Sequence, residues 1–209
     1  MGIDLVRAWR EAADASVHVG RNGMMSARAV LTYDDYIALP EDGPRHELYE
    51  GELVVMPPTT PDHQAIIVNL FIALAGHVWR YGLGDVSPAP IDVILSRITV
   101  VQPDLVYVET SRHAIVGEGA IEAAPTLVVE VLSPSTDARD RGVKQALYAR
   151  YGVPFYWVAD PAARDVQVLR LSGASYEAVA KLDETARRSL PPLPGLTLDP
   201  AALWPAPPG

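Results

Sequence analysis

The sequence contains no cysteine. Disulfide frameworks, thiolate metal sites and cysteine nucleophiles are therefore excluded. No apolar run reaches the length of a transmembrane helix, and the N-terminal residues lack the apolar core of a signal peptide. From these absences we expect a cytoplasmic protein that makes no use of a membrane.

Lysine is scarce, because the chain has fifteen arginines but only two lysines, Lys144 and Lys181. The net charge of −9 argues against a protein that coats nucleic acid through bulk charge alone. A nuclease is still compatible with this charge, because bound divalent ions and a local basic patch can reverse the potential inside a cleft.

The rest of the composition is that of an ordinary globular protein, with 49% hydrophobic and 21% charged residues. A chain of 209 residues is long enough to bury the core of one domain. We assign residues 1–30 to an N-terminal extension, 31–205 to a single domain and 206–209 to the end of a Pro-rich tail.

The pattern of the central region predicts alternating helices and strands. Three helices are expected: a short one after Thr32, a long one from Thr60-Pro61 to Gly82, and one from Ser135 or Thr136 to Tyr151. The expected strands cover residues 46–56 (a hairpin turning at 50–51), 91–95, 99–108, 127–132, 155–158, 166–171 and 176–182. Residues 196, 198, 203 and 204 are apolar and should hold the tail against the body. The predicted fold class is α/β, in an α+β arrangement: a mixed sheet flanked by helices, with an N-terminal hairpin and a C-terminal meander.

Glu130 is the most informative residue, because it interrupts an apolar strand, Leu127 to Leu132. Side chains alternate between the faces of a strand, and both faces are apolar here, which predicts a strand inside a covered sheet. A carboxylate in that setting is costly unless a cation, a metal ion or several donors accompany it.

The helix that follows Glu130 has two distinct faces. Its predicted core stripe consists of Val143, Leu147 and Tyr151. A second face carries Asp140, Lys144 and Tyr148 at four-residue spacing, which brings a cation near the end of the strand. The alternative is that Asp140 and Lys144 form an ordinary exposed ion pair.

A second carboxylate follows Pro103 within the predicted strand 99–108. A proline inside such a run suggests an edge, a bulge or a bend, and a bend can aim Asp104 into a cleft. Asp92 lies in the preceding strand, where we expect it to pair with Arg97 or to lie on an exposed face.

Three further polar residues precede these strands. Glu47 and Glu52 lie on the predicted hairpin, where an acidic side chain is usually solvated; we favour that interpretation for Glu52 and leave Glu47 open. His63 lies in the first turn of the long helix, and we favour simple exposure over a chemical role there.

Five segments in this order give the chain a family resemblance: HELYEGELVVM, PDHQ, PIDVIL, VVQPDLVYV and PTLVVEVLSPSTDARDRGVKQALYARYGVPFYWVADP. Each segment alone is weak evidence for a family, but the order and spacing of the five segments together are specific. The chain resembles the Uma2 family (DUF820), a branch of the PD-(D/E)XK restriction-endonuclease-like superfamily, from about Leu31 to Trp204.

The resemblance implies a set of site residues. In the superfamily, an Asp and a Glu on adjacent strands bind Mg²⁺, and a Lys two residues after the Glu positions or activates water. The resemblance therefore implies that Asp104 and Glu130 bind Mg²⁺ or Mn²⁺. Leu132 occupies the lysine position, which is a departure, and the resemblance implies that Lys144 stands in for it. Glu47 matches an acidic position of the leading hairpin and would complete the catalytic set.

Three functions are compatible with these residues. The first is a Mg²⁺-dependent endonuclease on DNA, acting as a homodimer because cutting two strands needs two sites, and using no organic cofactor. The second is a catalytically inactive module of the same fold that binds nucleic acid or protein. The third is a nuclease on RNA, or on branched or single-stranded DNA. The wide apolar surface of the long helix, which includes Ile66, Ile72 and Ala73, suits a subunit contact.

Overall fold

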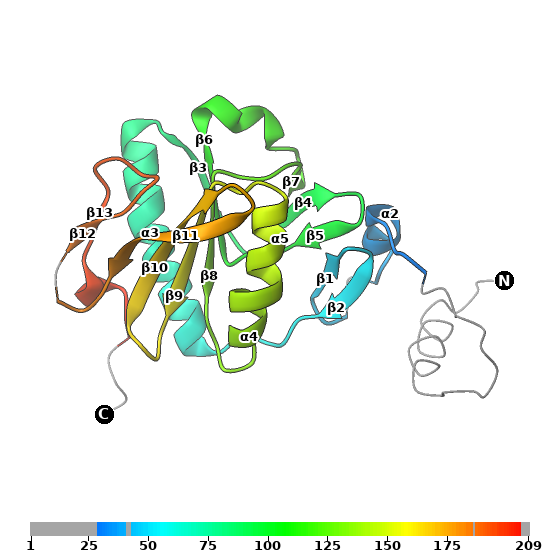
Figure 1. The fold of residues 1–209 in the computed structure, drawn as a ribbon, viewed down its shortest axis with the longest axis horizontal. Coiled ribbons are helices and arrows are strands. Elements are labelled where there is room, and N and C mark those ends of the chain that lie inside the picture. Colours follow the sequence, from blue (N-terminus) through cyan, green and yellow to red (C-terminus); the bar gives the residue numbers. More distant parts are fainter. Residues whose placement is uncertain (1–28, 41–42, 186, 206–209) are drawn as a thin grey trace.

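The structure is a computed structural model that describes residues 29–40, 43–185 and 187–205 (Figure 1). The predicted extension 1–30, apart from its last two residues, and the tail end 206–209 lie outside the described residues. The architecture is mixed α/β, with two mixed sheets and few helices. The prediction of a mixed α/β fold is therefore confirmed, but the strands divide between two sheets instead of one.

The larger sheet has six strands in the order β11-β10-β9-β8-β6-β3. Only β8 and β9 pair in parallel within it, and the other neighbours are antiparallel. The predicted C-terminal meander is confirmed as β9, β10 and β11. The strands are β3 (Gly84–Pro88), β6 (Leu105–Glu109), β8 (Leu127–Val131), β9 (Phe155–Asp160), β10 (Asp165–Ser172) and β11 (Ser175–Leu182).

The second sheet contains the predicted N-terminal hairpin and has the order β2-β1-β5-β4-β7. The hairpin turns through Glu50 and Gly51, whose φ values of 51° and 85° are those of a two-residue type I′ connection. The strands are β1 (His46–Tyr49), β2 (Glu52–Val55), β4 (Asp92–Ser96), β5 (Thr99–Val101) and β7 (Ala120–Ile121). A separate short ribbon joins β12 (Arg188–Ser189) to β13 (Thr197–Leu198).

The prediction of one continuous strand over residues 99–108 was wrong. The chain leaves the second sheet after Val101 and enters the larger sheet at Leu105. Pro103 cannot donate a ladder hydrogen bond, so the chain bends there and changes sheets. Strand β3 was not predicted, since its sequence contains Gly84 and Pro88, which are depleted in strands, and it lies at a sheet edge.

Helix α3 (Pro61–Tyr81) covers one face of the larger sheet. Its predicted ends are confirmed: the Thr60 hydroxyl accepts a hydrogen bond from the His63 amide, and Gly82 ends the helix at φ 61°. The apolar side chains predicted to hold the tail are buried against this layer: Leu196, Leu198, Leu203 and Trp204. The short helices are α2 (Tyr33–Ile37), capped at Thr32 as predicted, η2 (Thr110–Ile115) and η4 (Pro200–Ala202).

The opposite face of the larger sheet is covered by a helix built from three segments, with α5 in front of the sheet in Figure 1. They are α4 (Asp137–Arg139), the π-helical turn η3 (Asp140–Lys144) and α5 (Gln145–Arg150). A π turn contains more residues than an α turn. The helical face that points to the sheet before the π turn is therefore rotated relative to the face that points to the sheet after it. Val143, predicted in the core stripe with Leu147, is consequently 51% exposed, and this part of the prediction was wrong.

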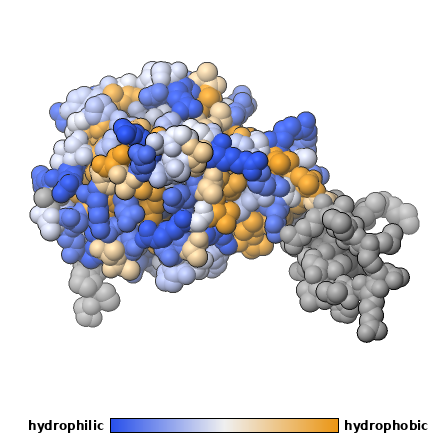
Figure 2. Space-filling view, viewed as in Figure 1, coloured by the Kyte–Doolittle hydropathy of each residue, from blue (hydrophilic) through white to orange (hydrophobic). Residues whose placement is uncertain are grey.

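The surface mixes hydrophilic and apolar side chains. Figure 2 shows apolar surface where the hairpin β1–β2 lies beside the three-segment helix, and the exposed hydrophobic residues include Val55 on β2 and Val143. Within the described ranges, no helix combines the length and the apolar character that a membrane crossing needs.

The rotated helix face predicts different costs for truncation at Leu147 and Val143. Leu147→Ala should lower the free energy of unfolding by about 2–4 kcal/mol, because it opens a cavity in the core. Val143→Ala should change it by less than about 0.5 kcal/mol, because that side chain is exposed. Urea unfolding of both variants measures the difference. Equal losses would show that Val143 is packed as the simple helical period implies.

Candidate active site

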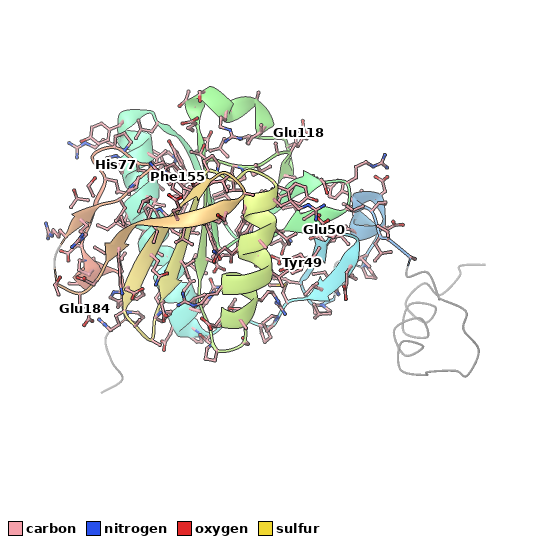
Figure 3. All side chains as sticks on the ribbon, in the orientation of Figure 1. Tyr49, Glu50, His77, Glu118, Phe155 and Glu184 are labelled. Atoms are coloured by element: carbon pink, nitrogen blue, oxygen red, sulfur yellow. The ribbon has the colours of Figure 1, made fainter. Side chains whose placement is uncertain are left out.

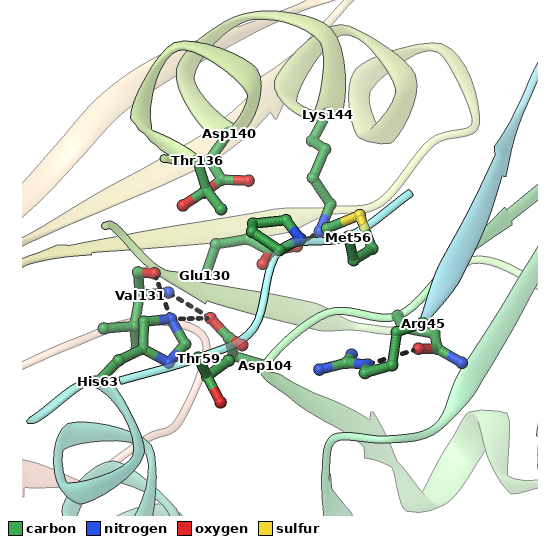
Figure 4. A pocket seen from close by; sticks show the side chains of 12 residues that line it. Arg45, Met56, Thr59, His63, Asp104, Glu130, Val131, Thr136, Asp140 and Lys144 are labelled. Carbon is green, nitrogen blue, oxygen red and sulfur yellow. Dashed lines mark hydrogen bonds and ion pairs between the residues drawn. The ribbon is translucent and has the colours of Figure 1, made fainter. Parts of the chain in front are cut away.

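A cavity of about 30 Å³ lies where the hairpin, the bend after β5, strand β8 and the three-segment helix meet (Figure 4). A water molecule needs roughly 10–15 Å³ measured in this way, so the cavity can admit a small ion or a few waters. Its lining combines carboxylates with cations and neutral side chains. The lining residues are Arg45, Met56, Pro57, Thr59, His63, Gln102, Asp104, Glu130, Val131, Thr136, Asp140 and Lys144.

Glu130 extends from β8 toward the helix, on the same face as Val128 and Leu132. It is 3% exposed, and its Oε1 atom accepts a hydrogen bond from the Tyr148 hydroxyl at 2.6 Å and forms an ion pair with Lys144 Nζ at 2.6 Å. Burial raises the pKa of Glu130 well above its usual range, although the charge of Lys144 acts to lower it. The sequence-based expectation that this buried carboxylate has a cation and further donors is confirmed.

Lys144 is 1% exposed and bridges two carboxylates. Its Nζ atom lies 2.6 Å from Glu130 Oε1 and 3.2 Å from Glu47 Oε1. Burial acts to lower the pKa of Lys144, but the charges of Glu130 and Glu47 outweigh it and raise the pKa. Lys144 therefore remains an ammonium ion across the ordinary pH range, and the alternative of an exposed Asp140–Lys144 pair is wrong.

Glu47 is fully buried on β1, although acidic residues on hairpins are usually solvated. Its Oε1 atom also accepts a hydrogen bond from the backbone amide of Gln102 at 2.7 Å, and the Tyr49 hydroxyl donates to Oε2. Glu52, on the partner strand, is exposed, as predicted. Of the two glutamates on the strands of the hairpin, Glu47 therefore contributes to the site and Glu52 does not.

Asp104 follows the bend at Pro103 and is tied to the end of β8. Its Oδ2 atom accepts a hydrogen bond from the backbone amide of Val131 at 2.8 Å and lies 3.4 Å from Nε2 of His63. Val131 directly follows Glu130, so this bond fixes the two predicted metal ligands relative to each other. The predicted bend does direct the Asp104 side chain into a cavity.

His63 is 7% exposed, so the expectation that it would be a solvated residue was wrong. Its Nε2 atom lies 2.8 Å from the carbonyl oxygen of Val131, which can only accept, so Nε2 carries a proton. Nδ1 is buried without a hydrogen-bond partner among the described residues. Burial acts to lower the pKa of His63, but the hydrogen bond and the charge of Asp104 raise it overall. The sequence did contain a signal for the burial of His63, because this residue precedes the buried residues Ile67, Leu70 and Leu74 at helical spacing.

Asp140 belongs to the site as well, although the sequence did not predict it there. It is buried on the π turn, and Figure 4 shows its carboxylate beside Thr136 and above Glu130. Burial raises the pKa of Asp140 to about 6, although Lys144 and the hydrogen bond from Thr136 act to lower it. Asp92 lies outside the cavity and pairs with Tyr36 and Gln102, whereas Arg97 pairs with Asp34. The expected Asp92–Arg97 pair is therefore not formed.

The four predicted site residues Glu47, Asp104, Glu130 and Lys144 converge from four different elements. Among the described residues, no three acidic or histidine side chains are close enough together to form a ready-made metal centre. Asp104, Glu130 and Asp140 nevertheless line one cavity with carboxylates, which are the oxygen ligands that Mg²⁺ and Mn²⁺ prefer. Mg²⁺ in proteins usually binds one or two carboxylates and keeps several waters, so the donor set fits this ion.

A sequence model of the Uma2 family, described as "Putative restriction endonuclease", matches residues 33–201. The chain belongs to the Uma2 family. The prediction from the five quoted segments is thereby confirmed. The match spans nearly all of the residues that the structure describes, including every residue of the cavity.

Two relatives place this Uma2 chain among known proteins. It is similar to the crystal structure of a "putative nuclease belonging to DUF820" from Anabaena variabilis, with a TM-score of 0.67 and 22% identity, covering 83% of this chain and 97% of that one. It is also 31% identical, over 121 residues, to the uncharacterized protein slr1290 of Synechocystis; the match spans 57% of this chain and 62% of the relative. The structural likeness establishes a shared fold.

The raised pKa of Asp140 predicts a pH-dependent effect of Asp140→Asn on stability. Ionising Asp140 is unfavourable in the folded state, so the cost is absent below pH 3.8, grows as the pH rises, and is complete above about pH 6. Asp140→Asn should therefore be more stable than the wild type by about 1–3 kcal/mol at pH 8. At pH 4 the two proteins should be nearly equal in stability.

Urea unfolding at the two pH values measures this difference. The control is Glu118→Gln, on the exposed η2–β7 connection that Figure 3 shows well away from Tyr49 beside the site. If Asp140→Asn were more stable than the wild type by the same amount at both pH values, the electrostatic explanation would be contradicted.

Proposed function

We propose that this Uma2 chain is a Mg²⁺-dependent endonuclease that hydrolyses phosphodiester bonds of DNA. The observation that carries the proposal is the placement of Asp104 and Glu130 in one cavity beside a buried ammonium ion. Family membership supports a nuclease, and the chemistry of these residues supports phosphodiester hydrolysis. We also propose that the observed fold is a restriction-endonuclease-like fold of the PD-(D/E)XK superfamily.

Asp104 and Glu130 would hold the metal ion, and Mn²⁺ could take the place of Mg²⁺. Each carboxylate has one oxygen engaged by the protein: Val131 donates to Oδ2 of Asp104, while Oε1 of Glu130 accepts from Tyr148 and forms an ion pair with Lys144. When bound, the ion supplies Lewis-acid polarisation of a phosphoryl oxygen and lowers the pKa of a coordinated water.

Lys144 contributes positive charge. Because its pKa is raised, it keeps its protons and stabilises the negative charge that grows on the phosphoryl oxygens in the transition state. Glu47 and Glu130 hold its Nζ atom in place, so no reorganisation is needed when that charge develops. In this way Lys144 takes the role of the lysine that is missing at Leu132.

His63 and Glu47 position other residues. His63 binds the Val131 carbonyl and approaches Asp104, so it links helix α3 to both ligand-bearing segments. Glu47 connects Lys144 to the backbone of Gln102, two residues before Asp104. These contacts keep the ligand-bearing segments in register, which is the structural requirement for a preorganised site.

A catalytically inactive module that binds nucleic acid is the second candidate. Two observations favour it: a buried leucine, Leu132, occupies the lysine position, and Lys144 is engaged by two carboxylates within the protein. Such a module would bind DNA without cutting it, so cleavage separates the two candidates.

Removing either metal ligand should abolish cleavage without unfolding the protein. Asp104→Asn and Glu130→Gln retain an oxygen that accepts the existing hydrogen bonds, so both variants should fold. Loss of several kcal/mol of transition-state stabilisation corresponds to a rate decrease on the order of 10³-fold. Plasmid and oligonucleotide cleavage with Mg²⁺ or Mn²⁺ measures the rate, and Glu118→Gln, on an exposed loop, is the matched control.

Two results would contradict the nuclease. Undiminished cleavage in both variants would place the chemistry elsewhere. Binding of DNA by the wild type without cleavage of plasmid, single-stranded DNA or RNA would favour the inactive module.

Cutting both strands needs two sites, so the proposal includes a homodimer. Helix α3 carries exposed apolar side chains at Val68, Ile72 and Trp79, spaced so that they share one helical face. Such a face, outside the core, suits contact with a second copy of the chain. Ile72→Glu should therefore convert a dimer to a monomer in sedimentation equilibrium. Ile37→Glu, at an exposed apolar residue of α2, should leave the dimer intact, and a monomeric wild type would refute this part of the proposal.

A further inference from the structure

Two arginines contact Met56, a residue that lines the cavity. The backbone amide of Met56, just after β2, donates a hydrogen bond of 2.8 Å to the carbonyl of Arg45, just before β1. Nη1 of Arg139, on α4, lies 3.3 Å from the sulfur of the same methionine. The base of the hairpin and the start of the helix therefore meet at Met56, which contacts the backbone of Arg45 and the guanidinium group of Arg139.

Among the described residues, the Arg45 side chain makes one hydrogen bond, through its Nε atom. Nε donates to Oε1 of Gln102 at 3.0 Å, and Gln102 is fixed in turn because its amide groups donate to Glu47 and Asp92. Figure 4 shows the rest of the Arg45 guanidinium reaching from this contact toward Asp104. The planar group is thus oriented, and its Nη atoms are directed into the cavity.

Among the same described residues, the one partner of the Arg139 side chain is the sulfur of Met56. A thioether sulfur is a weak acceptor, so the contact with Met56 uses little of the donor capacity of Arg139. Arg141, two residues later, differs, because it pairs with both Asp137 and Asp160. In the part of the chain that the structure describes, neither Arg45 nor Arg139 lies within ion-pair distance of a carboxylate.

This arrangement separates the charges of the site. Carboxylates of Asp104, Glu130 and Asp140 line the interior, while the Arg45 guanidinium is held by Gln102 at the cavity and the Arg139 guanidinium lies against the sulfur of Met56. In a chain of net charge −9, two arginines that have no acidic partner among the described residues and lie next to an acidic cavity offer a place for an external anion. A guanidinium fits a phosphate particularly well, because its parallel N–H groups can bind two oxygens at once.

We propose that Arg45 and Arg139 form a clamp beside the acidic cavity that binds neighbouring backbone phosphates of the DNA strand to be cut. The inference rests on the proposed nuclease function and names the residues that hold its substrate. The clamp fixes the position of the strand over the carboxylates, and it reads no base, because contacts to phosphate carry no sequence information. It also explains how an acidic protein could bind a polyanion.

Binding of a short fluorescein-labelled DNA duplex, followed by anisotropy over a series of salt concentrations with Ca²⁺ in place of Mg²⁺, tests the clamp. Arg45→Gln and Arg139→Gln should each weaken binding by about 10-fold, and each should reduce the magnitude of the salt slope by about one. The double variant should lose both phosphate contacts and bind DNA more weakly than either single variant. The control is Arg80→Gln, the same change 17 residues after His63 on helix α3 and roughly 25 Å away, which should bind like the wild type.

Replacing Arg45 with lysine distinguishes binding of phosphate from a merely structural role of this residue. Arg45→Lys keeps the charge but cannot reproduce the contact to Gln102 together with a second contact. If Arg45 binds phosphate, the lysine variant should recover most of the affinity and of the salt slope. If Arg45 only supports the hairpin, the lysine variant should be as weak as the glutamine variant, and the clamp would be overturned.

The outcomes also separate this inference from the proposed function. Unchanged binding by both glutamine variants overturns the clamp, even if Mg²⁺-dependent cleavage by the wild type is established. Weakened binding in a protein that never cuts DNA supports the clamp and overturns the nuclease. A wild-type protein that binds no DNA overturns both.

Discussion

The burial of Lys144 between Glu130 and Glu47 is the constraint on which the rest of the site depends. An ammonium ion and two carboxylates lose their hydration when they are buried, and this loss is offset only if every charge has well-placed partners. Tyr148, Tyr49 and the amide of Gln102 supply the remaining hydrogen bonds. Strand β8, the hairpin and the π turn are consequently fixed relative to one another, because each contributes a group to this network.

The bend at Pro103 extends this arrangement to Asp104. The chain passes from one sheet to the other at residues 102–104, and Gln102 binds Glu47 while Asp104 binds the amide of Val131. One short segment thereby connects the hairpin to the end of β8. The cavity lies at the junction of the two sheets, where strands end and their side chains are not used for packing. This explains how a small protein can keep several carboxylates together without losing its core.

Much of the fold and part of the site followed from local signals in the sequence. The helix ends at Thr60 and Gly82, the hairpin turn at Glu50-Gly51 and the anomalous Glu130 each depend on residues close in sequence. His63 could have been recognised as buried, because it continues the apolar face of its helix. Val143 could not be placed correctly, because the π turn that exposes it does not follow from simple helical periodicity. The extra strand β3 was hidden by its glycine and proline.

Residue type, order and short-range spacing were enough to predict the family, the mixed α/β class and a set of candidate site residues. The burial of Glu47 and Asp140, the bridging of two carboxylates by Lys144, and the contacts of Arg45 and Arg139 with the same methionine became visible only in the folded chain. These residues are separated by up to about a hundred positions along the chain. Their interactions arise where two sheets and a helix pack together, and no local pattern encodes the distances between such elements.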